Sequence, residues 1–337
     1  MVSVIMAAYN TRGFVSAALD SVFSQTYPDF QIVVVDDASS DGTADILRSY
    51  KDSRLVVLHN ETRRGAAYSR NRAIKEATGE FLAILDADDF WAPDKLEEQV
   101  GFMNEHPTAS GVGSYVYETD QTGRRIRAVR FPVYPGQIRC STFFRCTIVH
   151  SSVMLRRSFM TDNNLWYDDT FPGSHDFELW SRAVFAGDFH HIPRYLTYYR
   201  RNPGQISEDI TGTQKEHAIK VYRNLLQKMG YEPTQNELDC HLRLSGLIAD
   251  PKNESKGYQS VLIWCEKIYR KNLEKQVFRQ YLFANEILLR FLKYCYDNSL
   301  GSFRTLRLMA CLHWRMRWCF FPYFQLFQRL SITVKDV

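Results

Sequence analysis

Three aspartates stand directly after the apolar run of residues 81–85, at positions Asp86, Asp88 and Asp89. The run is too short and too apolar for anything but a buried segment, and Gly79 before it favours a strand that enters the middle of a sheet. Carboxylates gathered at the end of such a strand repel one another unless a cation neutralises them. Their hard oxygen atoms suit Mg2+ or Mn2+, which would hold a diphosphate. Acidic pairs are also common in solvated turns, so the surroundings must decide between the two interpretations.

A second apolar run ends in carboxylates as well. Residues 31–35 have the composition of a buried strand, and Asp36 and Asp37 follow them. The loop after them opens a helix that runs to about residue 50, for which Asp41 is the predicted N-cap. Two predicted strands therefore present carboxylates at one edge of a sheet.

A further acid stands at the start of another predicted helix. A Pro172-Gly173 turn leads into this helix, and Asp176 falls in its first turn, where the helix dipole favours the ionised carboxylate. Such a carboxylate can take the proton of an attacking hydroxyl group while a nucleotide diphosphate leaves. The alternative is that Asp176 is only an N-terminal helix acid.

The elements that must position these residues alternate along the first 90 residues. The predicted strands are residues 2–7, 31–35, 54–58 and 81–85, and the predicted helices between them are residues 12–25, 43–50 and 65–77. This spacing is that of βαβ units. It predicts an α/β fold with a mainly parallel sheet covered by helices on both faces.

The loops lack the two common phosphate-binding motifs. No Gly-x-Gly-x-x-Gly follows the first strand, and no Gly-x-x-x-x-Gly-Lys-Ser/Thr occurs anywhere in the chain. The chain therefore lacks the phosphate-binding loops that define dinucleotide dehydrogenases and P-loop nucleotidases. A diphosphate would have to be held by a metal and by basic side chains, for which Arg70 on the third helix is a candidate. An arginine on a helix is otherwise a solvated or ion-paired residue.

Four motifs in this order resemble the family 2 glycosyltransferases, which are inverting enzymes with the Rossmann-like GT-A fold that use nucleotide-diphospho sugars. The motifs are residues 4–10, 33–43, 65–71 and 85–89, and the resemblance extends over about residues 1–207.

The resemblance implies roles for the residues at the motif positions. For the nucleotide sugar these are Ala8 and Tyr9 at the base pocket, Asp36 bonded to the base, Arg70 against the nucleotide and Asp86 at the ribose. It also implies that Asp88 ligates the metal and that Asp176 is the catalytic base.

Two positions depart from the family pattern. His175 stands where relatives usually have glutamate, and Asn202 stands where many relatives have a histidine that can ligate the metal. His175 is expected either to shape the acceptor pocket or to serve as a structural hydrogen-bonding partner. Asn202 still offers an amide oxygen, a weaker ligand. Both changes bear on the metal coordination and the acceptor, and not on the reaction class.

The chain after the motifs changes in composition. We predict a catalytic domain over residues 1–210, a helical extension over residues 211–300 and a basic aromatic tail over residues 301–337. Residues 298–335 contain no acidic residue, and their Arg and Lys side chains interrupt a dense series of large apolar residues. This pattern is typical of an amphipathic segment in a membrane interface, and its alternative is a terminal helix packed on protein.

The composition is that of a globular protein, with 45% apolar and 24% charged residues among 337. A formal net charge of +4 is too small to indicate a nucleic-acid partner. The seven cysteines contain no Cys-x-x-Cys pair, which favours reduced thiols, and no apolar run is long enough to span a membrane. We therefore expect a cytoplasmic protein, peripheral on the cytosolic membrane face.

These observations predict a metal-dependent, inverting hexosyltransferase. It would move a sugar from a nucleotide-diphospho donor, expected to be UDP-linked, to a saccharide or lipid-linked saccharide hydroxyl in polysaccharide synthesis. One alternative is a sugar nucleotidyltransferase, although the Gly-rich activation loop of that class is replaced here by Ala8-Tyr9-Asn10. The other is a non-catalytic sugar-nucleotide-binding protein, although the acidic residues are all retained.

Overall fold

The computed structural model describes residues 1–202, 212–249 and 257–298. The chain divides into two compact units. The first unit consists of Met1–Ile138 and Cys146–Ala218, and the second consists of Arg139–Arg145 and the chain from Ile219 on. A short internal segment of the N-terminal region therefore belongs to the C-terminal unit, which the sequence did not predict.

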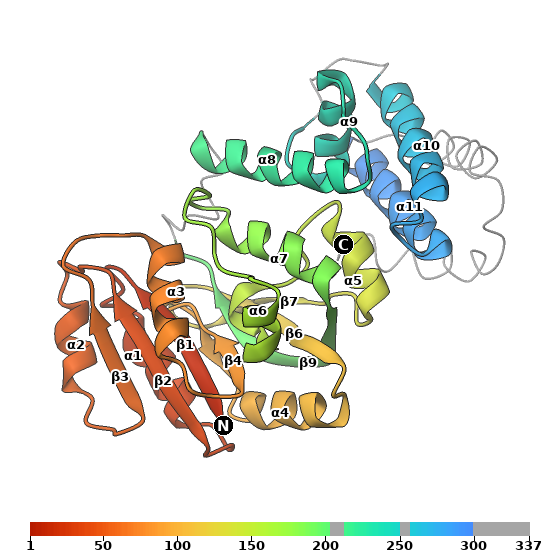
Figure 1. Cartoon of the computed structure of the whole chain (residues 1–337). Helices are drawn as coiled ribbons and strands as arrows, with labels where there is room; N and C mark the ends of the chain where they lie inside the picture. Colours follow the sequence, from red (N-terminus) through yellow and green to blue (C-terminus); the bar gives the residue numbers. More distant parts are fainter. Residues whose placement is uncertain (203–211, 250–256, 299–337) are drawn as a thin grey trace. The chain divides into compact units, whose positions relative to one another are not determined.

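The first half of the sheet is parallel, in the order β3-β2-β1-β4. Its strands are β1 (Val2–Ala8), β2 (Phe30–Asp36), β3 (Leu55–His59) and β4 (Phe81–Ile84). The helices between them in the chain are α1 (Val15–Phe23), α2 (Thr43–Ser49) and α3 (Ala66–Glu76) (Figure 1). The strands and helices predicted for the first 90 residues are confirmed, with ends that differ by a few residues.

The side chains of β1 alternate between two apolar cores. Val4 and Met6 pack in one core with the buried face of α1, and Ile5 packs in the other core with α3. All three side chains are fully buried. Because both faces are covered, every residue of β1 except Ser3 is apolar. The helices on both faces confirm the predicted α/β fold.

The second half of the sheet is mixed. Its strands are β8 (Met154–Arg156), β6 (Ala109–Thr119), β9 (Asp188–Arg200), β5 (Phe90–Trp91) and, paired only with β6, β7 (Arg125–Val129). Here β6 and β9 pair in parallel, and the other pairs are antiparallel. The remaining elements of this unit are α4 (Lys95–Glu105), α5 (Pro135–Thr142, which ends in the second unit), η1 (His150–Ser152), α6 (Arg157–Asp162) and α7 (His175–Ala186). The predicted parallel sheet thus continues in strands of both directions.

One predicted cap was wrong by one position. Gly42, not Asp41, occupies the N-cap of α2, with φ of 96° in the left-handed region that favours glycine. The carboxylate of Asp41 still accepts a hydrogen bond from the backbone N of Thr43 at 2.9 Å. The acid therefore caps the helix from one residue further back.

The second unit is helical in its described part, as predicted. Its helices are α8 (Thr213–Lys228, which begins in the first unit), α9 (Gln235–Ser245), α10 (Gly257–Lys275) and α11 (Gln280–Asp297). His241 Nε2 bonds the carbonyl of Phe143 at 3.0 Å, and Tyr222 OH donates to the carbonyl of Phe144 at 2.8 Å. The inserted segment is therefore part of this unit's core. Within residues 1–202, 212–249 and 257–298, no helix combines the length and apolarity needed to cross a membrane.

Candidate active site

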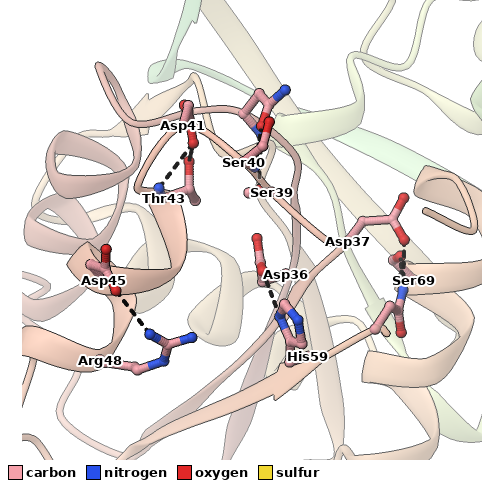
Figure 2. A network of polar contacts seen from close by, with 12 residues as sticks. Asp36, Asp37, Ser39, Ser40, Asp41, Thr43, Asp45, Arg48, His59 and Ser69 are labelled. Carbon is pink, nitrogen blue, oxygen red and sulfur yellow. Dashed lines mark hydrogen bonds and ion pairs between the residues drawn. The ribbon is translucent and has the colours of Figure 1, made fainter. Parts of the chain in front are cut away.

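The carboxyl ends of three neighbouring strands form one row. Ala8 of β1 pairs with Asp36 of β2, and Asp36 pairs with His59 of β3. The Asp36 side chain is 1% exposed, and its Oδ2 lies 2.7 Å from His59 Nδ1 (Figure 2). Its Oδ1 is buried and has no hydrogen-bond partner among the described residues. Within the described residues, only one of the two oxygens of the predicted base-binding carboxylate therefore has a hydrogen-bond partner.

The loop after β1 is tied to the loop after β2. Asn10, with φ of 51°, donates its backbone N to Ser39 Oγ at 3.0 Å, and its Oδ1 accepts from the backbone N of Ser40 at 2.9 Å. Tyr9 just before it is 37% exposed, and the guanidinium of Arg63 lies 4.1 Å from its ring centre. The loop thus presents an aromatic ring next to the residue that pairs with Asp36.

The Asp37 carboxylate accepts hydrogen bonds from within the protein, mainly from backbone N–H groups. Its carboxylate accepts hydrogen bonds from the backbone N of Arg64 at 2.8 Å, the backbone N of Gly65 at 2.7 Å and Asn60 Nδ2 at 2.6 Å. Burial raises the pKa of Asp37, but these hydrogen bonds outweigh it and the net pKa is lowered. The ionised side chain fixes the start of α3, the helix that carries Arg70.

Arg70 joins two of the predicted site residues. Its guanidinium is paired with the Asp86 carboxylate and also donates to His175 Nε2. Burial raises the pKa of Asp86, but the charge of Arg70 outweighs it and the net pKa is lowered. Burial, followed by the charge of Arg70, lowers the pKa of His175 well below its usual range. His175 is therefore a neutral acceptor, and the buried Arg70 Nε has no partner among the described residues.

Asp89 holds the acidic loop in place. Its buried carboxylate accepts hydrogen bonds from Ser151 Oγ and, at 2.7 Å, from the backbone N of Arg200. Arg200 Nε in turn donates to the carbonyl of Asp88 at 2.7 Å. The loop after β4, the short helix η1 and the end of β9 are thereby joined around Asp88.

Asp88 and Asn202 lie together, although 114 positions separate them in the chain. Asn202 Nδ2 donates to Asp88 Oδ2 at 3.1 Å, and the buried Asn202 Oδ1 has no partner among the described residues. No group of three His, Cys, Asp or Glu side chains that could bind a metal occurs in the described ranges. This pair fits a cation that takes its other ligands from a diphosphate, because Mg2+ commonly binds one or two carboxylates together with substrate phosphates.

Asp176 lies in the first turn of α7, as predicted. Its side chain is half-buried, and Oδ1 accepts a hydrogen bond from the backbone N of Phe177 at 2.7 Å. Burial, with a contribution from the charge of Asp86, raises the pKa of Asp176. A raised pKa makes a carboxylate a stronger proton acceptor.

The structure thus brings some predicted residues into direct contact and not others. Arg70, Asp86 and His175 form one group, Asp88 and Asn202 form a second, and Asp36 stands beside Ala8. Sequence reasoning missed the partners His59, Ser151 and Arg200. Each is distant in the chain from the residue it bonds, so no local pattern pointed to it. Sequence reasoning also counted Asp89 among the carboxylates that need a cation, whereas Ser151 and Arg200 bond that carboxylate.

A buried polar network supports the segment that contains Ser151. Trp91 Nε1 donates to the carbonyl of Ser151 at 2.7 Å, and Gln99 Nε2 donates to the carbonyl of Ser152 at 2.8 Å. Lys95, which is fully buried, donates to Gln99 Oε1 at 2.6 Å, and its Nζ lies 3.9 Å from the centre of the Trp91 ring. Burial lowers the pKa of Lys95 well below 10.5.

The buried lysine predicts a pH dependence of stability. The unfolded chain keeps the Lys95 proton up to about pH 10.5, and the folded chain releases it at lower pH, so the unfolded state binds more protons between the two values. We expect the free energy of unfolding to rise from pH 7 to pH 9 relative to a Lys95→Met variant. The rise is at most about 1.4 kcal/mol per pH unit. Denaturant titrations of both proteins measure it, and a constant difference would show that folded Lys95 keeps its proton.

Comparison with known proteins identifies the family. The family described as Glycosyl transferase family 2 matches residues 3–185, which is more than half of the chain. The chain is 32% identical over 255 residues to UDP-Glc:alpha-D-GlcNAc-diphosphoundecaprenol beta-1,3-glucosyltransferase WfaP from Escherichia coli, which covers 74% of this chain and 94% of that protein. It is 43% identical over 115 residues to the enzyme of the same activity named WfgD from Escherichia coli, covering 34% of this chain and 46% of that protein.

Among solved structures, S. aureus TarS 1-349 in complex with UDP-GlcNAc is similar, with a TM-score of 0.60 and 18% sequence identity. The similarity covers 92% of this chain and 90% of that chain, and it shows the fold alone. The predicted GT-A fold is confirmed. Neither the nucleotidyltransferase nor the non-catalytic alternative is favoured, because the relatives named by activity are glycosyltransferases. The chain belongs to glycosyl transferase family 2 and is a glycosyltransferase.

Proposed function

We propose that this protein moves a hexose, with inversion, from a UDP-linked donor to a saccharide hydroxyl of a lipid-linked acceptor. The observation that carries the proposal is the buried Oδ1 of Asp36, which has no partner within the described part of the chain and lies at the same sheet edge as Asp86 and Asp88. A nucleobase needs a hydrogen-bond acceptor such as Asp36 Oδ1, and a diphosphate needs carboxylates that can hold a cation. A nucleotide-sugar site needs both side by side. The donor and acceptor named for the Escherichia coli relatives, UDP-Glc and a GlcNAc-diphospho lipid, support the same assignment.

The nucleotide would bind along the ends of β1 and β2. Ala8 and Tyr9 would line the base pocket, with the exposed Tyr9 ring available for stacking. Asp36 Oδ1 would accept a hydrogen bond from the base. Arg70 and Asp86, held together by their ion pair, would face the nucleotide and the ribose.

Asp88 and Asn202 would hold a Mn2+ or Mg2+ ion together with the donor diphosphate. The support for this role is Asn202 Oδ1, which lies beside the Asp88 carboxylate and has no partner among the residues that the structure describes. The bound cation neutralises the charge of the departing diphosphate. The contribution of the chain is to hold two oxygen ligands in place, with Asp89 and Arg200 fixing the loop behind them.

Asp176 would be the catalytic base that accepts the proton of the attacking hydroxyl. Its raised pKa and its place at the start of α7 support this role. His175 beside it would act as a positioning residue, because its Nε2 accepts a hydrogen bond from Arg70. The catalytic residues all fall within residues 1–210, the proposed catalytic domain.

A donor panel tests the reaction class. We expect UDP release from at least one UDP-sugar in the presence of a GlcNAc-diphospho-lipid acceptor and Mn2+. The reason is that the proposed site binds the nucleobase and holds a cation that neutralises the diphosphate. No turnover is expected from sugar-1-phosphate with UTP, and pyrophosphate should not form. Pyrophosphate release in that second assay, with no UDP release in the first, would contradict the proposal.

We further propose that residues 301–337 bring the enzyme to an anionic membrane surface. These residues lie outside the described part of the chain, so the support is their composition and the lipid-linked acceptor of the relative. Truncation before Ser302 should remove binding to anionic liposomes in a co-sedimentation assay, and added salt should weaken binding of the full chain. Equal sedimentation of the intact and truncated proteins, or none of either, would contradict this role.

A further inference from the structure

His59 lies where the nucleotide site ends and the surface begins. It is the last residue of β3, its side chain is 51% exposed, and the neighbouring strand places Asp36 directly beside it. Figure 2 shows the two side chains facing one another, with one carboxylate oxygen of Asp36 bonded to His59 and the other pointing away. The backbone of the next residue adds to the link, because Asn60 N donates to the Asp36 carbonyl at 2.9 Å.

The contact divides the two carboxylate oxygens of Asp36 between different tasks. A carboxylate oxygen accepts hydrogen bonds, so His59 Nδ1 carries the proton and donates it to Oδ2 at 2.7 Å. This hydrogen bond fixes the rotation of the carboxylate about its last side-chain bond. The remaining oxygen, Oδ1, is buried and has no partner among the described residues, a costly state for an acceptor. A ligand that supplies an N–H group to Oδ1 would complete the pair.

We propose that His59 is a positioning residue for nucleobase selection, which orients Asp36 so that Oδ1 accepts the imide N–H of uracil. The inference rests on the proposed function, since it assigns the base of the same donor. Uracil carries a proton at N3, whereas cytosine carries a lone pair there. A fixed carboxylate therefore attracts the first base and repels the second. His59 contributes by holding the carboxylate still, without touching the reacting atoms.

Binding of UDP and CDP to the full chain, measured by calorimetry with Mn2+, tests the assignment. In His59→Leu we expect UDP to bind about tenfold more weakly and the preference for UDP over CDP to fall, because the carboxylate loses a charge-assisted hydrogen bond. His59→Asn, whose Nδ2 can replace Nδ1 as a donor, should restore both values to within about threefold of wild type. His106→Leu is the matched control, since His106 is an exposed histidine at the end of α4, where its Nδ1 lies 3.0 Å from the carbonyl oxygen of Phe102.

Coupling to Asp36 separates a specific role from a structural one. In an Asp36→Asn background, His59→Leu should change UDP binding by less than about twofold, because the oriented acceptor is already gone. Thermal unfolding of each variant shows whether it is folded. Wild-type preference for UDP that survives unchanged in a folded His59→Leu variant would overturn the inference while leaving the proposed function intact. Failure of wild type to bind any nucleoside diphosphate would instead overturn the proposed function.

Discussion

Replacement of Asp88 by alanine is expected to reduce sugar transfer by about 1,000-fold, because the negative charge of the departing diphosphate is then no longer neutralised. The fold should survive, because Asp88→Ala keeps the contacts that Ser151 and Arg200 make with the Asp89 carboxylate and the contact of Arg200 Nε with the carbonyl of residue 88. The measurement is UDP release by the purified full chain with and without Mn2+.

The controls for this prediction separate loss of the cation from loss of the fold. Asp162→Ala, which removes an exposed carboxylate at the end of α6, should leave the rate unchanged. Treatment of wild type with EDTA should reproduce the Asp88→Ala defect, and added Mn2+ should restore wild type but not the variant. Full activity in EDTA, or in Asp88→Ala, would end the metal-dependent account.

Replacement of Asp176 by asparagine is expected to lower the rate of transfer by about 100-fold or more, with UDP binding little changed. The amide keeps the shape of the side chain and cannot accept a proton. Because burial raises the pKa of Asp176, the acid limb of the wild-type pH–rate profile should lie above pH 3.8, the usual value for aspartate. The rate should fall as pH drops through that limb, since the protonated carboxyl is no base.

Single-turnover kinetics and a pH–rate profile check this second prediction. Asp169→Asn is the matched control, because Asp169 is an exposed acid only seven positions away. A near-normal rate in Asp176→Asn would move the role of the base to Asp168, Asp169 or Glu178. Of these, Glu178 is already paired with Arg182 at 2.7 Å, which makes it the weakest substitute.

Much of the site could be predicted from the sequence because it follows from strand ends. Buried apolar runs that stop in charged residues place Asp36 and Asp86 at the carboxyl edge of a parallel sheet, where βαβ connections bring strand ends together. The turn predicted before the helix similarly placed Asp176 in the first turn of α7. These are local patterns with a strong physical cause. The structure contains the two predicted strands and the predicted helix. The expectation that the helix dipole favours the ionised form of Asp176 was not met, because burial raises the pKa of this carboxyl.

The partners of those residues could not be predicted, because they depend on register and on distant pairing. Nothing around His59 distinguishes it from a solvated strand end until β2 and β3 are aligned. The same holds for Asp89, which meets Arg200 across 111 positions, and for Lys95, whose place in the sequence gives no sign that it is fully buried. The mixed second half of the sheet could not be predicted for the same reason, since all of its pairs except β6 with β7 join strands far apart in the chain.

The proton-acceptor account predicts a single displacement, so the configuration of the transferred sugar tests it most directly. With the donor and acceptor that give turnover, proton NMR of the purified product reports the anomeric configuration of the new bond. A donor whose sugar is α-linked to UDP is predicted to give a β-linked product, because the activated hydroxyl attacks the face opposite the departing diphosphate. An α-linked product would contradict the role of Asp176 and the inverting mechanism together.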